Sequence, residues 1–397
     1  MSEMISLQIK RKDAGKIKSG FPLLRKEAIV NPHVLKKEGQ LLRLVTESGE
    51  FLGAGYYGKQ NKGYGWVLTT NEREKIDESF FINKLSQALA YRSSFFQNLS
   101  TTAFRVFNGE GDGIGGLTIE YFEGYYVINW YSEGIYAFKD LILSALKKVV
   151  QYKGLYEKKR FDQQGQYIED DDFVDGERAQ FPLIIKENDV NFATYLNDGA
   201  MVGIFLDQRN VRERIKEHYA KNKTVLNLFS YTGAFSVSAA VGGASKTTSV
   251  DVANRSLSKT IEQFNINQLD HEAHDIIVED VFHYFKYAKR KEFTYDLVIL
   301  DPPSFARSKK FRFSVAKDYQ KLLEDTIDLT NDNGVIVAST NYSGFDMKKF
   351  KTFIDGAFKA KGERYKILEE YKLPKDFKTN PHFKEGNYLK VVFIQKA

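Results

Sequence analysis

The chain has 397 residues, a length that favours two or three domains over a single compact core. Its 31 Phe, 23 Tyr and 28% charged residues exclude a disordered chain and fit a folded protein with sizeable cores. The formal net charge of +6 is modest, and the absence of cysteine excludes disulfides, thiolate metal sites and a thiol nucleophile.

The sequence also limits where the protein works and what it binds. No apolar run approaches the roughly 20 residues that cross a bilayer, and the first 16 residues lack the apolar centre of a signal sequence. We therefore expect a cytoplasmic protein with no membrane partner. The six histidines show no metal-binding spacing, so we expect no metal site.

Residues 1–76 are predicted to form a small β-rich domain with a basic beginning. Seven Lys or Arg residues, among them Lys10, Arg11 and Lys12, stand against two acids in the first 26 positions. Such a run steers polyanions, although a solvated surface explains it equally well. RNA binding by this domain is therefore one of two open interpretations.

Residues 77–188 are predicted to form a central α+β domain. Asp77 can cap a helix in which Phe81, Leu85 and Ala88 recur at helical spacing. The glycine-rich stretch at 108–116 could suggest a phosphate site, but no helical pattern follows it. A hairpin connection is the favoured interpretation.

Residues 189–397 alternate between strands and helices, which predicts a mostly parallel sheet of seven strands covered by helices on both faces. The predicted strands are 224–229, 246–251, 275–280, 295–301, 334–340, 365–371 and 388–395.

Three successive strands of this predicted sheet end in an acid: Asp251, Asp280 and Asp301. Ligands of such sheets bind beyond the carboxyl ends of the strands. Asp251 can accept hydrogen bonds from ribose hydroxyls, and Asp280 from an adenine amine. The preceding turn around Gly233 lacks the glycines of a dinucleotide site and the lysine of a phosphate loop. These residues together indicate a nucleoside without a diphosphate.

This pattern resembles the class I S-adenosylmethionine-dependent methyltransferases, a resemblance that covers residues 190–397. It implies a Rossmann-like fold with S-adenosylmethionine as cofactor. It also implies that Phe229, Ser230, Tyr231 and Gly233 surround the amino acid part and ribose of the cofactor.

The motif "DPPSF" follows the fourth strand of the sheet. Pro302 and Pro303 fix a rigid turn that directs Asp301 toward a pocket, and Phe305 could stack on a base. A turn with a core phenylalanine remains the alternative. A second basic run follows the motif and could contact RNA through Arg307, Lys309 and Lys310.

The whole chain is similar to a bacterial family of large-subunit ribosomal RNA methyltransferases with an N-terminal PUA domain. The stretches that carry the resemblance include "FNGEGDGIGGLTIEYF", "GIFLDQRNVR", "LNLFSYTGAFSVSA" and "FKEGNYLK". It implies that the N-terminal domain binds RNA, free or in an assembling subunit, and that Asp207 and Arg209 lie near the cofactor. A homodimer is left open.

Family members that make 5-methylcytosine place a cysteine where this chain has Tyr342. A thiolate must add to carbon 6 before carbon 5 of cytosine becomes nucleophilic, and a neutral phenol replaces it poorly. A related family that methylates guanine N7 has a similar "STNYSGF" stretch, which implies that Asn341 orients the base and Tyr342 lies beside it. A nitrogen lone pair needs only alignment with the methyl group.

We therefore expect nitrogen methylation of ribosomal RNA, with cytosine C5 methylation as the runner-up. A small-molecule or protein substrate and an inactive homologue that only binds RNA or cofactor remain further alternatives.

Overall fold

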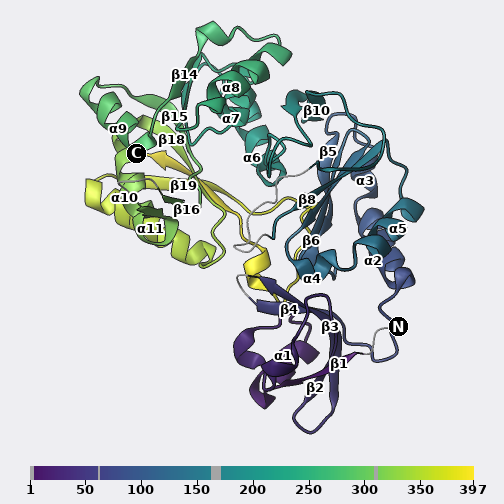
Figure 1. Cartoon of the computed structure of the whole chain (residues 1–397). Helices are drawn as coiled ribbons and strands as arrows, with labels where there is room; N and C mark the ends of the chain where they lie inside the picture. The colour runs from purple at the N-terminus through teal and green to yellow at the C-terminus, as the bar shows by residue number, and fades with distance from the viewer. Residues whose placement is uncertain (1–3, 61–62, 162–170, 308–311) are drawn as a thin grey trace. The chain divides into compact units, whose positions relative to one another are not determined.

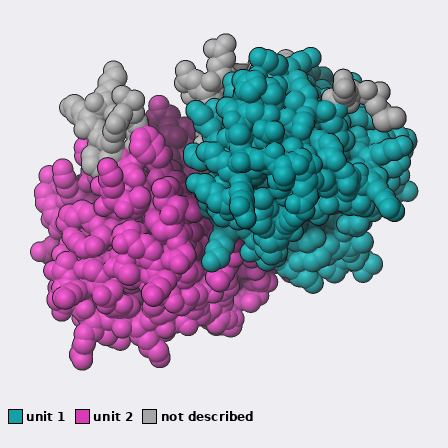
Figure 2. Space-filling view, turned by 90° about the horizontal axis from the view of Figure 1, so that it is seen from below, with its two compact units in different colours: residues 1–185, 194–202, 375–386 teal, residues 186–193, 203–374, 387–397 magenta. Residues whose placement is uncertain are grey.

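The computed structural model describes residues 4–60, 63–161, 171–307 and 312–397. The chain divides into two compact units (Figure 2). Unit 1 contains residues 1–185, 194–202 and 375–386, and unit 2 contains residues 186–193, 203–374 and 387–397. Since unit 1 includes two later segments of the chain, the limits 1–76, 77–188 and 189–397 stay predictions.

Unit 1 begins with a four-stranded sheet and one helix (Figure 1). β1 pairs with β2 in parallel, and the other neighbours are antiparallel. The apolar residues of α1 and of alternate strand positions form a separate core that includes Ile17, Leu42 and Leu44. The elements are β1 (Ile5–Ile9), α1 (Arg11–Lys18), β2 (Leu41–Thr46), β3 (Phe51–Gln60) and β4 (Gly63–Thr69).

A five-stranded sheet with helices follows in the same unit. Asp77 caps α2 by accepting a hydrogen bond from the Phe80 amide at 3.2 Å, which confirms the predicted helix start. The glycine-rich stretch connects the antiparallel strands β5 and β6, which confirms the hairpin. The elements are α2 (Glu78–Tyr91), α3 (Ser93–Phe96), β5 (Ala103–Asn108), β6 (Leu117–Phe122), β7 (Tyr125–Trp130), α4 (Glu133–Tyr136), α5 (Lys139–Val149), β8 (Gly154–Lys159) and β9 (Phe173–Gly176).

A buried arginine joins distant parts of unit 1. Arg92 is fully buried and forms a bidentate ion pair with Asp112, with Nη2 to Oδ2 at 2.7 Å. Its Nε and Nη2 also donate to the backbone carbonyl of Asp376, at 2.9 and 2.7 Å. Residues 375–386 are thereby tied to the end of α2 and to the β5–β6 connection.

Unit 2 is built on a seven-stranded sheet in the order β14-β13-β12-β15-β18-β20-β19. All neighbours are parallel except those of β20, which is antiparallel to both β18 and β19. The seven predicted strands are confirmed, with ends shifted by a few residues. They are β12 (Thr224–Leu228), β13 (Lys246–Asp251), β14 (Asp275–Val278), β15 (Tyr295–Leu300), β18 (Thr330–Thr340), β19 (Tyr365–Tyr371) and β20 (Lys390–Lys396).

Helices cover both faces of this sheet because its strands are apolar on both faces. In β15, Val298 and Leu300 pack with α9, α10 and α11, whereas Leu297 and Ile299 pack with α6 and α7. The helices are α6 (Arg209–Arg214), α7 (Ala234–Val241), α8 (Arg255–Ile266), α9 (Val281–Arg290), α10 (Val315–Asp328) and α11 (Met347–Lys361). Two short pairs complete the chain, β10 (Leu183–Glu187) with β11 (Val190–Thr194) and β16 (Phe305–Arg307) with β17 (Arg312–Ser314).

This architecture confirms the predicted Rossmann-like class I sheet. The chain reverses direction of travel across the sheet between β12 and β15, and that switch point is where open α/β sheets bind ligands. Within the described ranges, no helix is long and apolar enough to cross a membrane.

Candidate active site

A cavity of about 500 Å³ lies at the carboxyl ends of the strands on both sides of the switch point. A volume of this size suits a small-molecule ligand. Nine residues predicted from the sequence line it: Asp207, Phe229, Tyr231, Asp251, Asp280, Asp301, Pro302, Pro303 and Asn341. Seven further residues line it that the sequence did not indicate: Phe205, Gln208, Val252, Val281, Phe282, Phe313 and Leu389.

The turn after β12 holds an unusual backbone conformation. Phe229 and Tyr231 have φ of 59° and 53°, and Gly233 has φ of 78°. Only glycine adopts such angles without cost, so the turn stores strain at the cavity wall. A side chain on Gly233 would also place its Cβ 2.5 Å from Cγ2 of Thr260. The glycine is therefore required both by its φ and by the close approach of α8.

Asp251 is held by the turn that it faces. Its Oδ2 accepts a hydrogen bond from the Tyr231 amide, and its Oδ1 accepts one from the Ala253 amide, both at 2.9 Å. Each carboxylate oxygen has a second lone pair. The carboxylate is thus fixed in place with capacity to bind ligand hydroxyls.

Asp280 combines a structural contact with exposure to the cavity. Its Oδ1 caps α9 by accepting from the amides of Phe282 and His283, at 2.9 and 3.3 Å. One carboxylate oxygen serves the helix, and the other can accept from a ligand amine.

Three aromatic rings form one wall of the cavity. The Phe313 ring centroid lies 6.5 Å from that of Phe229 in a stacked arrangement, and 6.0 Å from that of Phe282. Phe313 is almost fully buried. A planar, apolar ligand surface such as a purine ring matches this wall.

Asp301 is the acid whose ionisation the fold disfavours most clearly. Burial and, to a smaller extent, the charge of Asp207 raise the pKa of Asp301, whose net value is about 6. Hydrogen bonds from Ser339 and Gln208 and the charge of Arg212 act in the opposite direction and lower this pKa. The carboxylate therefore titrates close to neutral pH, as acids in functional sites often do.

Five predicted site residues lie outside the cavity lining. Ser230 and Gly233 belong to the strained turn, and Arg209 is buried at the start of α6. Phe305 is 59% exposed in β16, and the Tyr342 ring packs against Phe345 at 5.2 Å between centroids. The stacking of Phe305 on a base and the place of Tyr342 beside the base therefore stay predictions.

Asn341, in contrast, lies at the cavity as expected from its position after β18. Its Oδ1 accepts a hydrogen bond from the Ser304 hydroxyl, which leaves its amide nitrogen as a donor at the cavity. The segment 301–304 after β15 and the segment 339–341 at the end of β18 are therefore joined by a side-chain hydrogen bond.

The basic residues predicted to bind RNA lie in both units. Lys10, Arg11 and Lys12 precede and begin α1, and they form no ion pair with any described residue. Arg307 ends β16, whereas Lys309 and Lys310 lie outside the described residues.

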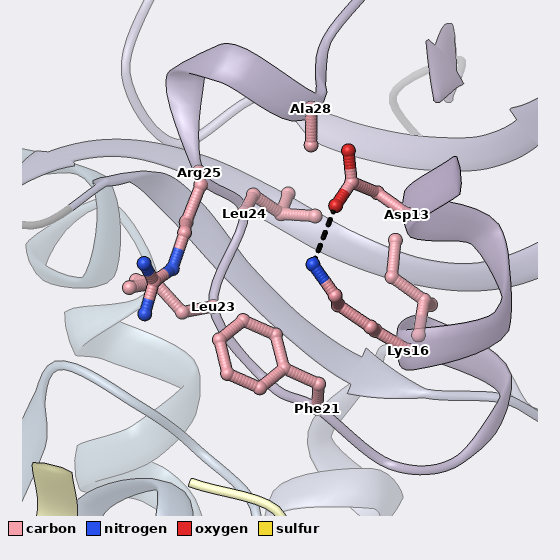
Figure 3. Close-up of a pocket in the computed structure, with 8 residues that line it drawn as sticks. Asp13, Lys16, Phe21, Leu23, Leu24, Arg25 and Ala28 are labelled. Carbon is pink, nitrogen blue, oxygen red and sulfur yellow. Dashed lines mark hydrogen bonds and ion pairs between the residues drawn. The ribbon is translucent and has the colours of Figure 1, made fainter. Parts of the chain in front are cut away.

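A second cavity, of about 210 Å³, lies beside this basic helix (Figure 3). Lys16 forms an ion pair with Asp13 at 2.9 Å, and Arg25 stacks over the Phe21 ring at 5.4 Å from its centroid. Leu23, Leu24, Ile17 and Ala28 supply its apolar walls.

The main cavity fits the cofactor that the sequence implied. S-adenosylmethionine offers ammonium, ribose hydroxyl and adenine amine donors, and the cavity presents acceptors on Asp207, Asp251, Asp280 and Asp301. Gln208 adds a buried amide oxygen with no hydrogen-bond partner among the described residues. Donors on the ligand and acceptors on the protein are therefore complementary.

Comparison with known proteins agrees with this chemistry. Residues 155–356 match the family described as S-adenosylmethionine-dependent methyltransferase, and residues 7–70 match a PUA-like domain. YwbD of Bacillus subtilis, named as a candidate ribosomal RNA large subunit methyltransferase, is 63% identical over 98% of this chain and 99% of its own. Ribosomal RNA large subunit methyltransferase I of Aliivibrio fischeri is 29% identical over 89% of each chain.

A solved structure extends the likeness to three dimensions. The candidate methyltransferase SMU.776, crystallised with S-adenosylhomocysteine, is 39% identical. It superposes with a TM-score of 0.91 over 99% of this chain and 100% of its own.

Proposed function

Because the chain belongs to the S-adenosylmethionine-dependent methyltransferases, we propose that it methylates a base nitrogen, such as guanine N7, in large-subunit ribosomal RNA. The names of the relatives from Bacillus subtilis and Aliivibrio fischeri support this class of substrate. The observation that carries the choice of nitrogen is the absence of cysteine from all 397 residues.

Methylation of cytosine C5 requires a nucleophile that this site lacks. The Tyr342 phenol, at the position of the usual cysteine, packs on Phe345 and does not line the cavity. A ring nitrogen already has a lone pair, so alignment of the base is the main contribution that the protein must make. Asn341 offers an amide donor at the cavity for that purpose.

The residues of the cavity divide into two roles. Asp251 and Asp280 would hold the ribose and the adenine of S-adenosylmethionine, beside the wall of Phe229, Phe282 and Phe313. When bound, this cofactor supplies a methyl group on a positively charged sulfur. Guanine N7 carries no proton, so the base becomes positively charged when N7 receives the methyl, and an ionised Asp301 would stabilise that charge. No proton has to leave N7, so no general base is required for methylation at this atom.

RNA contact is proposed for the PUA-like domain. Lys10, Arg11 and Lys12 have no acidic partner among the described residues and are available to phosphates. The adjacent cavity, with its stacked Arg25 and Phe21, offers a surface of the kind on which unpaired bases pack (Figure 3).

The experiment that tests the proposal is mass spectrometry of nucleosides from large-subunit RNA. We compare a deletion strain with strains complemented by the intact gene or by Asp301→Ala. Loss of a methylated guanine that only the intact gene restores is the expected result. Loss of 5-methylcytosine instead would overturn the nitrogen route, and an unchanged nucleoside profile would favour an inactive RNA- or cofactor-binding homologue.

A further inference from the structure

A buried glutamine joins the two strand ends on the substrate side of the cavity. Gln208 ends the 3-10 turn at Leu206–Gln208 and is 3% exposed. Its Nε2 donates to Oδ2 of Asp301, directly after β15, at 3.1 Å, and to Oγ of Ser339, in β18, at 2.8 Å. One amide group therefore contacts residues 93 and 131 positions away in the chain.

The orientation of this amide follows from its partners. An ionised carboxylate only accepts hydrogen bonds, so the side of Gln208 that faces Asp301 must be the NH2 group. The opposite oxygen, Oε1, is buried and has no hydrogen-bond partner among the described residues. The NH2 group of Gln208 is therefore committed to Asp301 and Ser339, while Oε1 is left as the acceptor that the cavity offers to a ligand.

The segment that carries Gln208 is fixed independently of any ligand. Arg212 donates from Nη2 to the Phe205 carbonyl at 2.7 Å and is paired with Glu187. The Gln208 amide is thus presented to Asp301 by a rigid support.

We propose that Gln208 is a positioning residue, which holds the Asp301 carboxylate at the cavity and keeps it ionised at neutral pH. The inference rests on the proposed role of Asp301 in stabilising the methylated base. It assigns to Gln208 an effect that acts through Asp301 rather than on the substrate directly.

The charges around Asp301 show why such help is required. Burial and the nearby carboxylate of Asp207 both disfavour its ionised form, while Arg212 favours it. The hydroxyl of Tyr319 is bonded to the Ser339 carbonyl at 2.9 Å and so does not donate to Asp301. Removing the Gln208 donor takes away one of the few groups that lower the pKa of Asp301.

The test compares Gln208→Leu with Gln263→Leu. Gln263 is a second buried glutamine of unit 2, bonded to the backbone of Ala193 at 2.8 and 2.9 Å, and it controls for the loss of a buried amide. Methyl transfer to RNA from the deletion strain is measured between pH 5 and 9. We expect the acid limb of Gln208→Leu to move up by about one pH unit, and that of Gln263→Leu to stay in place.

A second measurement requires neither substrate nor cofactor. Because the folded pKa of Asp301 is raised, the wild type loses stability relative to Asp301→Asn as pH rises through that pKa. The difference in Tm between the two proteins therefore grows from about pH 4 to about pH 6 and then levels off. When both proteins also carry Gln208→Leu, the difference in Tm should level off about one pH unit higher.

The two measurements separate the possible failures. If the wild type transfers no methyl to RNA, the proposed function fails, and the Tm comparison still decides the role of Gln208. An equal loss of activity at every pH, with an unchanged Tm midpoint, would overturn the inference and leave Gln208 a structural residue. If Gln208→Leu does not fold, Gln208→Glu replaces it in both measurements. Its added carboxylate should raise the pH midpoint of the Tm difference further.

Discussion

Arg212 and Glu187 form a buried ion pair that fixes the segment carrying Asp207 and Gln208. Their side chains are 3% and 1% exposed, with Nε to Oε1 at 2.6 Å and Nη2 to Oε2 at 2.8 Å. Arg212 also donates a hydrogen bond to the Phe205 carbonyl, so this pair holds the lining segment that begins at Phe205.

The first prediction concerns this pair. Glu187→Gln leaves the Arg212 guanidinium buried without a counter-charge, and it should lower the free energy of unfolding by about 3–5 kcal/mol. Urea denaturation measures this. The control is Asp171→Asn, because the Asp171–Arg178 pair is more than half exposed and its loss should change stability far less. Equal effects of the two substitutions would contradict the prediction.

The turn at Gly233 gives the second prediction. Gly233→Ala combines a strained φ with a clash between the new Cβ and Thr260. Gly243→Ala is the control, because its φ of 85° is similar but its new Cβ would meet no atom closer than 3.8 Å. Strain alone should cost about 1–2 kcal/mol at each position. We expect Gly233→Ala to cost more and to weaken S-adenosylhomocysteine binding in calorimetry. An unchanged affinity would show that the turn does not contact the ligand.

Asp280 provides the third prediction, because its helix cap and its ligand contact can be separated. Asp280→Ala should lose about 1 kcal/mol of stability and bind S-adenosylhomocysteine about 5- to 100-fold more weakly. Asp77→Ala removes a comparable cap from α2 in unit 1 and should leave that affinity intact. If both variants bound the ligand as the wild type does, Asp280 would be only a cap.

The fourth prediction addresses RNA binding by the PUA-like domain. Changing Lys10, Arg11 and Lys12 to Glu should weaken binding to ribosomal RNA. If all three residues contact phosphate, the slope of log affinity against log salt concentration should become shallower by about two. Affinity for S-adenosylhomocysteine should not change. A control with the same net charge replaces exposed lysines elsewhere, at Lys286, Lys359 and Lys366. An identical salt slope in both triple variants would refute a specific basic surface.

The sheet could be predicted from sequence because its central strands are buried on both faces. Continuous apolar runs such as 297–300 and the acids that follow them mark both the strands and their carboxyl ends. Asp251, Asp280 and Asp301 therefore reached the cavity as expected. The antiparallel placement of β20 between β18 and β19 is a long-range pairing that no local pattern encodes.

Side-chain direction is what the sequence could not supply. Phe305 was expected to stack on a base, yet it is 59% exposed in β16, whereas Phe313 from the partner strand β17 lines the cavity. Phe282 stands two positions after Asp280, a spacing that could have indicated it. Gln208 stands in the quoted "FLDQR" stretch, but its partners Asp301 and Ser339 come from far along the chain.

The contact of Arg92 with the Asp376 carbonyl has a consequence for synthesis on the ribosome. Unit 1 starts at the beginning of the chain but includes residues 375–386, so its buried arginine lacks part of its shell until those residues emerge. Most of unit 2 is translated before that moment, although its sheet also waits for β20, which is made after residue 386. The part of the chain that is made first is therefore completed nearly last, and a nascent chain stalled before residue 375 would carry an unfinished first unit.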